Sequence, residues 1–281
     1  MATVTPTTNA VFIPEVWSAN ILAATEDNLV LANLVSRWDA DVKQAGDVIH
    51  IPNLANVTAV TKTPGTPLTA AANTETEDTI TVDQWKAVYM VIEDMTKAQS
   101  NYDLMKLYTD KIGFALAEAI DTSIAGLYSG LSQSVSAAAA LEDSEVITAV
   151  GYLDAANAPR DDRAFVIHSE VMADLRGVDK FITYDNTGSK GVQTGAANGL
   201  VANVYGVDVY MSNNIVEAAG TPNILHNLMF HKEAFGLALQ KAPSVESDRS
   251  LSNVGDELLG QTLYGVAELR DTFGVDVQVN S

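Results

Sequence analysis

The chain has 281 residues, 47% of them hydrophobic and 19% charged, which is typical of a folded protein with one large domain or two modest ones. The formal net charge of −20 argues against a surface that binds duplex nucleic acid, because such a surface needs clustered Lys and Arg and the 16 present are scattered. The absence of cysteine excludes disulfides, zinc thiolates and cysteine nucleophiles.

The N-terminal region predicts an arm. It has neither a basic segment nor a long apolar run, so it is not a signal peptide, and no stretch of the chain is apolar for long enough to span a membrane. Residues 1–13 are Thr-rich and have no core of their own. Pro14 fits the first turn of a helix that EVWSANILAAT continues, and a second short helix is expected around Leu29 to Val35.

Residues 42–92 predict a long two-stranded hairpin. Two runs rich in β-branched residues, VKQAGDVIHIPNLANVTAV and DTITVDQWKAVYMVIED, are separated by TKTPGTPLTAAANTETE, which has the composition of a flexible tip. An isolated hairpin is marginally stable in water because it has little to bury its faces against. The hairpin therefore indicates a partner surface, most simply another copy of the same chain.

A long amphipathic helix is expected at about 100–130. Ser100 or Asn101 can cap its start and Gly130 can end it. Apolar residues recur there at steps of three and four, and we interpret this stripe as core packing rather than a cofactor site. The stripe consists of Met105, Tyr108, Ile112, Ala115, Leu116, Ala119, Ile120, Ile124 and Leu127.

Shorter alternating elements follow and predict an α/β unit. The expected helices are 143–157 and 170–176, and the expected strands are 164–168, 207–211 and 226–231, with a β-rich segment at 235–241. Residues 185–199 and 242–256 have the composition of loops. The last segment, LLGQTLYGVAELRDTFGVDVQVN, predicts a final hairpin that turns near Asp271 to Gly274.

The stretch APRDDRAFVIHSEVMADL, residues 158–175, places His168 beside Ser169 and Glu170. A hydrolytic Ser-His-carboxylate set needs side chains that converge, whereas neighbours on one strand-to-helix turn point in different directions. We therefore interpret the stretch as a turn, a buried strand and a short helix. Ser169 is the expected N-cap, and Glu170 is expected in the first helical turn.

No catalytic, cofactor-binding or metal-binding site is predicted. The dinucleotide, P-loop and nucleophile-elbow motifs are missing, and a calcium loop beginning at Asp185 lacks its required glycine and glutamate. His226 and His231 have an odd separation within one predicted strand, so they should face opposite sides of the sheet. His50 is expected to be an ordinary strand residue.

Taken in order, these pieces resemble the major capsid proteins of tailed bacteriophages, which share the HK97-like fold. The resemblance also rests on APRDDRAFVIHSEVMADL, VYGVDVYMSNNI, LMFHKEAFGLAL and YGVAELRDTFGVDV. It implies an α+β, HK97-like chain with five parts. These are an N-terminal arm (1–41), an extended β-hairpin or E-loop (42–92), a peripheral domain with the spine helix (93–138), an α/β axial domain (139–241), and a return to the peripheral domain that ends in a C-terminal β hairpin (242–281).

The resemblance implies a structural protein, not an enzyme, with no cofactor. Copies would assemble as hexamers and pentamers into an icosahedral shell around packaged double-stranded DNA, without sequence-specific binding. Implied partners are the chain itself and scaffolding, portal and decoration proteins, but no membrane. The implied localisation is the virion capsid, assembled in the host cytoplasm. No large leader precedes the arm, so scaffolding is expected from a separate protein or from a leader already removed.

Some members of the family cross-link through an E-loop lysine. Lys62 is the lysine nearest the tip here, and its context gives no reason to transfer that chemistry. Two alternatives stay open. One is an encapsulin-like compartment shell, which keeps the fold. The other is a soluble α/β ligand-binding or hydrolytic protein that uses the hairpin as a lid.

Overall fold

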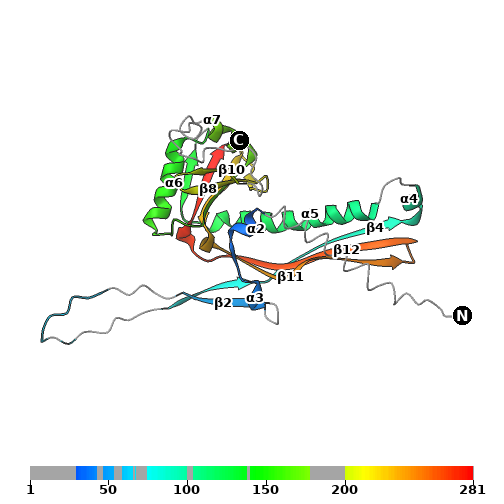
Figure 1. Cartoon of the computed structure of the whole chain (residues 1–281), viewed down its shortest axis with the longest axis horizontal. Helices are drawn as coiled ribbons and strands as arrows, with labels where there is room; N and C mark the ends of the chain where they lie inside the picture. Colours follow the sequence, from blue (N-terminus) through cyan, green and yellow to red (C-terminus); the bar gives the residue numbers. More distant parts are fainter. Residues whose placement is uncertain are drawn as a thin grey trace.

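The computed structural model describes residues 30–42, 47–53, 59–65, 67, 75–99, 104–137, 140–177 and 200–280. The expected helix after Pro14 and the loop at 185–199 lie outside these residues. A long helix and a sheet extend to one side of an α/β unit, and a hairpin extends to the other side (Figure 1).

The α/β unit is built around a seven-stranded sheet. Its strands are β5 (Ser134–Ala137), β6 (Arg163–Ile167), β7 (Leu200–Val204), β8 (Val207–Met211), β9 (Glu217–Ala218), β10 (Ile224–His231) and β13 (Gly274–Asn280). Six of them follow the order β5-β13-β10-β6-β8-β7, and β9 pairs with β10. Helices α6 (Asp143–Ala155) and α7 (Ser169–Gly177) contribute Val146, Leu153 and Val171 to the same core.

The sequence predicts this unit well, because its central strands are covered on both faces. All five residues of β6 are buried, as the apolar run AFVI requires. The strands expected at 164–168, 207–211 and 226–231 and the helices expected at 143–157 and 170–176 agree with the structure to within two residues at each end.

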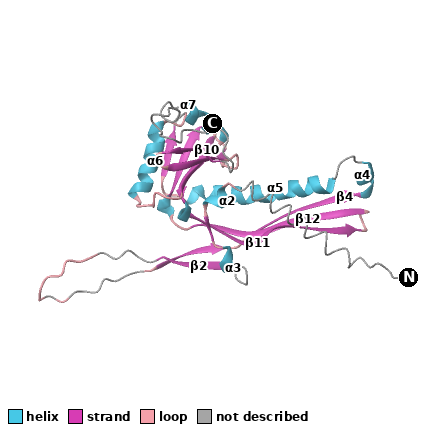
Figure 2. Ribbon diagram, viewed as in Figure 1, coloured by secondary structure: helices cyan, strands magenta, loops and turns pink. Residues whose placement is uncertain are grey.

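The second unit, called the spine unit below, consists of a helix laid along a four-stranded sheet (Figure 2). The helix is α5 (Leu104–Ala125), continued by the 3-10 turn η2 (Gly126–Gly130). The strands, in sheet order, are β1 (Ser36–Arg37), β11 (Phe235–Ser250), β12 (Gly255–Glu268) and β4 (Gln84–Glu93), and β4 leads into α4 (Asp94–Gln99). The expected apolar stripe is confirmed, since Ile112, Leu116 and Ile120 are at most 1% exposed.

Two connections, each from one strand through a 3-10 turn into the next, join the units. Strand β10 continues through the 3-10 turn η4 (Lys232–Ala234) into β11, and β12 returns through η5 (Asp271–Phe273) into β13. The junction is packed, because Phe235 of β11 and Tyr264 of β12 are fully buried in one hydrophobic core with residues of the α/β unit. The Leu269 N–H also donates to the carbonyl of Ala234 at 2.8 Å.

The remaining described elements are a hairpin and two short helices. Strands β2 (Val48–Asn53) and β3 (Thr76–Thr81) pair antiparallel as a two-stranded sheet. Helices α2 (Leu31–Leu34) and α3 (Asp39–Val42) precede it. A small cluster at the base of the hairpin fixes it to the spine unit, because Ile80 and Val82 pack there against Ala238 of β11.

The expected hairpin over 42–92 is correct for β2 and β3 and wrong for residues 84–92. Strand β4 pairs with β12 over its whole length, from Gln84 with Tyr264 to Glu93 with Gly255. The reason is packing: Val88, Met90 and Ile92 recur at every second position and meet the apolar face of α5. A β-branched run predicts a strand but does not say which strand it pairs with.

Two further expectations near the C-terminus are wrong. Strands β12 and β13 do not form a hairpin, because β12 pairs with β11 and β4 whereas β13 pairs with β10 and β5. The last strand therefore belongs to the α/β unit and not to the spine unit. Residues 242–250 are strand and not loop, since β11 runs to Ser250; this part of β11 reads as polar because one of its faces is exposed.

Candidate assembly surfaces

One face of the spine sheet is not covered by α5, and we call its exposed part the open face. Alternate residues of β4 point away from the helix, and among them Trp85 is 71% exposed and Tyr89 is 56% exposed. Leu259 of β12 lies opposite Tyr89 in the ladder. Aromatic side chains exposed together on a flat sheet are typical of a surface that another chain covers.

The open face has an acidic rim. A shallow depression of about 450 Å³ lies between β4, β11 and β12, lined by Tyr89, Glu246, Ser247, Asp248, Glu257 and Leu259. A hydrogen bond to Glu257 raises the pKa of the Tyr89 phenol. Hydrogen bonds from Ser250 and then from Tyr89 lower the pKa of the Glu257 carboxyl, so the tyrosine stays neutral beside an ionised acid. The surface therefore combines apolar area with negative charge.

The hairpin has the complementary character. Residues 54–74, between its strands, contain no acidic residue and a single lysine, Lys62. Val60 is 70% exposed, Lys62 is exposed beside it, and Gly65 turns the chain with a φ of 88°. The chain as a whole has a net charge of −20, whereas this tip carries a positive charge and is only weakly polar.

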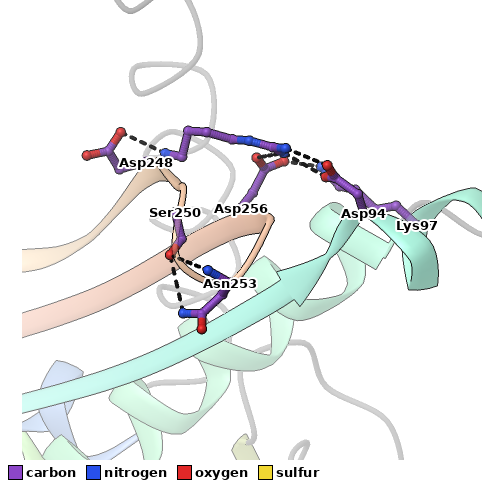
Figure 3. A network of polar contacts seen from close by, with 7 residues as sticks. Asp94, Lys97, Asp248, Ser250, Asn253 and Asp256 are labelled. Carbon is purple, nitrogen blue, oxygen red and sulfur yellow. Dashed lines mark hydrogen bonds and ion pairs between the residues drawn. The ribbon is translucent and has the colours of Figure 1, made fainter.

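The far end of the spine unit is held by ion pairs (Figure 3). The guanidinium of Arg249 on β11 binds the carboxylates of Asp94 and Asp256, and Lys97 of α4 binds Asp256 as well. The hydrogen bond from Arg249 holds the pKa of the Asp94 carboxyl below its usual range. The network ties α4 to the β11–β12 turn, where Leu251 is 88% exposed.

Asp121 of α5 is a buried polar residue that the sequence reasoning missed. Its Oδ2 accepts the Val30 N–H at 3.2 Å and its Oδ1 accepts the Ala32 N–H at 3.3 Å. Burial raises the pKa of its carboxyl to about 6, against the hydrogen bonds that lower it. A signal was present, since an aspartate between Ile120 and Ile124 interrupts the apolar stripe.

The structure places the His168-Ser169-Glu170 trio at the junction between β6 and α7. Met172 N donates to the His168 carbonyl at 3.1 Å, so the helix begins at Ser169 and His168 occupies the N-cap position expected for Ser169. The Glu170 N–H donates to His168 Nδ1 at 3.4 Å, while the His168 N–H donates to Asn227 at 2.8 Å. These contacts join a strand to a helix.

The other histidines have structural surroundings. His226 Nδ1 lies 2.9 Å from Asp276 Oδ2, and its ring stacks on Tyr128. His231 meets the Phe273 ring edge-on, and exposed His50 lies 3.3 Å from Glu77. Within the described residues, no group of three or more metal-ligating side chains is placed to hold an ion. The described helices also include none with the length and apolar character needed to cross a membrane.

Comparison with known proteins points to one kind of assembly. A family model described as phage capsid protein matches residues 75–275, from the start of the β3 strand region into β13. No protein of curated function matches the sequence significantly.

Solved structures agree with that match. The chain is similar to a structure from Mycobacterium phage Che8, with 25% identity and a TM-score of 0.73 over 89% of this chain and 90% of that one. It is also similar to the capsid of the cyanophage P-SCSP1u, with 21% identity and a TM-score of 0.70 over 88% and 87% of the two chains. The mature capsid of bacteriophage PhiM1 matches with 17% identity and a TM-score of 0.67 over 91% and 86%.

Proposed function

The chain belongs to the phage capsid protein family, and from this premise we propose that its copies associate as hexamers and pentamers that close into an icosahedral shell. Its role is that of a major capsid protein that forms the shell, and its fold is HK97-like. The family match favours a phage shell over an encapsulin-like compartment and over a soluble ligand-binding protein.

The open face is the observation that carries the proposed contact between copies. Trp85 and Tyr89 are exposed to solvent in the isolated chain, and burial of their apolar surface by another chain would be favourable. The tip of the hairpin is complementary to this surface. Val60 offers apolar area, and the positive charge of Lys62 is opposite in sign to the acidic rim. We infer that the hairpin of one copy lies on the open face of the next.

The charge balance supports a shell that encloses packaged double-stranded DNA without binding it specifically. A net charge of −20 repels phosphate, so a negatively charged inner wall would let DNA slide during packaging. We propose scaffolding, portal and decoration proteins as further partners, assembly in the host cytoplasm, and a structural role without catalysis. Lys62 is a contact residue in this proposal and not a cross-linking one.

The double substitution Trp85→Ala with Tyr89→Ala tests the contact. We expect the wild-type chain to form shells, capsomers or tubes, and the double variant to need at least about a tenfold higher protein concentration for assembly, as for loss of an interface hot spot. Light scattering and negative-stain microscopy of the purified full chain measure this. The melting temperature should stay unchanged.

Tyr152→Ala is the matched control, because Tyr152 is a 38% exposed aromatic residue on α6, outside the open face. Assembly of the double variant at the wild-type concentration would contradict the proposed contact. A wild-type chain that stays a monomer of 29.9 kDa and binds a small ligand would contradict the proposed shell.

A further inference from the structure

The spine sheet has two long edges, β11 and β4, and they differ in how they are protected. An open edge presents a row of backbone N–H and C=O groups with which a strand of another chain can pair, so proteins protect such edges with proline, bulges and charged side chains. Strand β11, which β1 covers only at residues 236–237, has all three. It contains Pro243, its register with β12 shifts twice, and charged residues follow from Glu246 to Arg249.

The edge of β4 lacks this protection. Within the part of the chain that the structure describes, β12 is its one strand neighbour. The register with β12 is unbroken, β4 contains neither proline nor glycine, and Lys86 is the one charged residue from Gln84 to Ile92. Half of its ten residues are aromatic or β-branched, which favours strand pairing. A long, unprotected edge of this kind is a predicted site of pairing with another chain.

The backbone groups on the free edge of β4 can be identified from its ladder with β12. Asp94, which directly follows β4, donates its N–H to the Val254 carbonyl at 3.1 Å and so continues the register of Glu93 with Gly255. In an antiparallel ladder such bonds involve every second residue, and the residues between them point their N–H and C=O away from the partner strand. The outward-pointing backbone groups therefore belong to Trp85, Ala87, Tyr89, Val91 and Glu93.

The hairpin carries a segment that has the composition of a strand. Residues 59–63 read AVTKT, and three of these five residues are β-branched, yet the segment is exposed and belongs to no described helix or strand. In an extended segment Val60 and Lys62 would point to the same side, because side chains alternate. On β4 the open face carries Tyr89 and the exposed Glu93, so an apolar pair and a pair of opposite charges can form across the two segments.

We propose that residues 59–63 of one copy add as a strand to the free edge of β4 in the next copy. This inference rests on the proposed function, because it names the backbone contact by which the hairpin binds next to the open face. Contact between side chains alone would leave the outward N–H and C=O groups of β4 to water. Strand addition pairs them, and in this mode of recognition the main-chain hydrogen bonds provide affinity while alternate side chains provide specificity.

Ala87→Pro in the full chain tests the strand addition. Ala87 is exposed and its N–H points away from β12, so proline spares the ladder within the chain but removes a donor that the added strand needs. We expect this variant to need at least about a tenfold higher protein concentration for assembly, measured by light scattering, with its melting temperature close to that of the wild type. Ala87→Thr is the matched control, because it keeps the N–H and favours a strand, and it should assemble like the wild type.

Should Ala87→Pro fail to fold, hydrogen exchange of the wild-type chain decides alone. The amides of Ala87 and Tyr89 should gain at least about tenfold protection on assembly, whereas the Val88 amide, which faces β12, should already be protected in the unassembled chain. Shells that form without this gain, or Ala87→Pro shells at the wild-type concentration, overturn the strand addition and leave the proposed shell in place. Failure of the proposed shell would look different, because the wild-type chain would then stay a monomer, and the strand addition would fall with it.

Discussion

The two units of the molecule use their strands in opposite ways. In the α/β unit, seven of the eight residues of β10 are buried, because β13 and β6 pair with its two edges and core side chains pack against both of its faces. In the spine unit, one of the ten residues of β4 is buried, because α5 covers a single face. The first unit completes its own core. The second presents a face that only another surface can cover, and this is what a shell subunit requires.

Truncation of an aromatic side chain should destabilise the α/β unit far more than the open face of the spine unit. Phe230 is fully buried on β10 and packs edge-on against Phe235 at 5.1 Å between ring centroids. We expect Phe230→Ala to lower the free energy of unfolding by about 3–5 kcal/mol, measured by urea denaturation of the unassembled chain. Trp85→Ala, at the open face, should lower it by less than about 0.5 kcal/mol.

Equal losses in these two variants would contradict the comparison, because they would mean that the exposed tryptophan already has an intramolecular partner. A loss at Phe230 below about 1 kcal/mol would show that the core of the α/β unit is loosely packed.

The contact between α5 and the spine sheet should give the next largest effect. A Cβ added at Gly260 of β12 would clash with Ile112 Cγ2, so Gly260→Ala must displace the Ile112 side chain or the helix that carries it. We expect a loss of about 1–3 kcal/mol in the same denaturation experiment. The control is Gly151→Ala on α6, which meets open space and should stabilise the chain by about 0.5–1 kcal/mol. A neutral Gly260→Ala would show that α5 is not closely packed on the sheet.

The ion pairs at the far end of the spine unit should give the smallest effect. Arg249→Gln removes the bonds to Asp94 and Asp256, but these side chains are partly exposed and water screens them. We expect a slightly lower melting temperature in dilute buffer and no difference from wild type in about 1 M salt. Arg160→Gln, at an 84% exposed side chain on the α/β unit, should change nothing in either buffer. A loss that persists in high salt would indicate that the network does more than hold α4.

Most of the elements could be predicted from the sequence, whereas their pairing could not. Local periodicity identified α5, α6, β6 and β8, since burial on one or two faces dictates where apolar residues recur. The partner of β4 and the sheet that contains β13 depend on contacts between residues far apart in the chain, and β-branched runs look alike whichever strand they join. The open face was hidden for the same reason. Trp85 and Tyr89 read as members of a hairpin until β12 supplied their neighbour.

The sequence by itself determined the order of most helices and strands, and it predicts that the hairpin needs a partner surface. These follow from local patterns of polarity, because an apolar residue indicates a buried position and a polar residue indicates an exposed one. Only the tertiary structure decided that Asp121 caps α2, that β12 and β13 part into different sheets, and that Trp85 and Tyr89 share an uncovered face. Each of these is a contact between segments distant in sequence, and such contacts are set by how the whole chain packs.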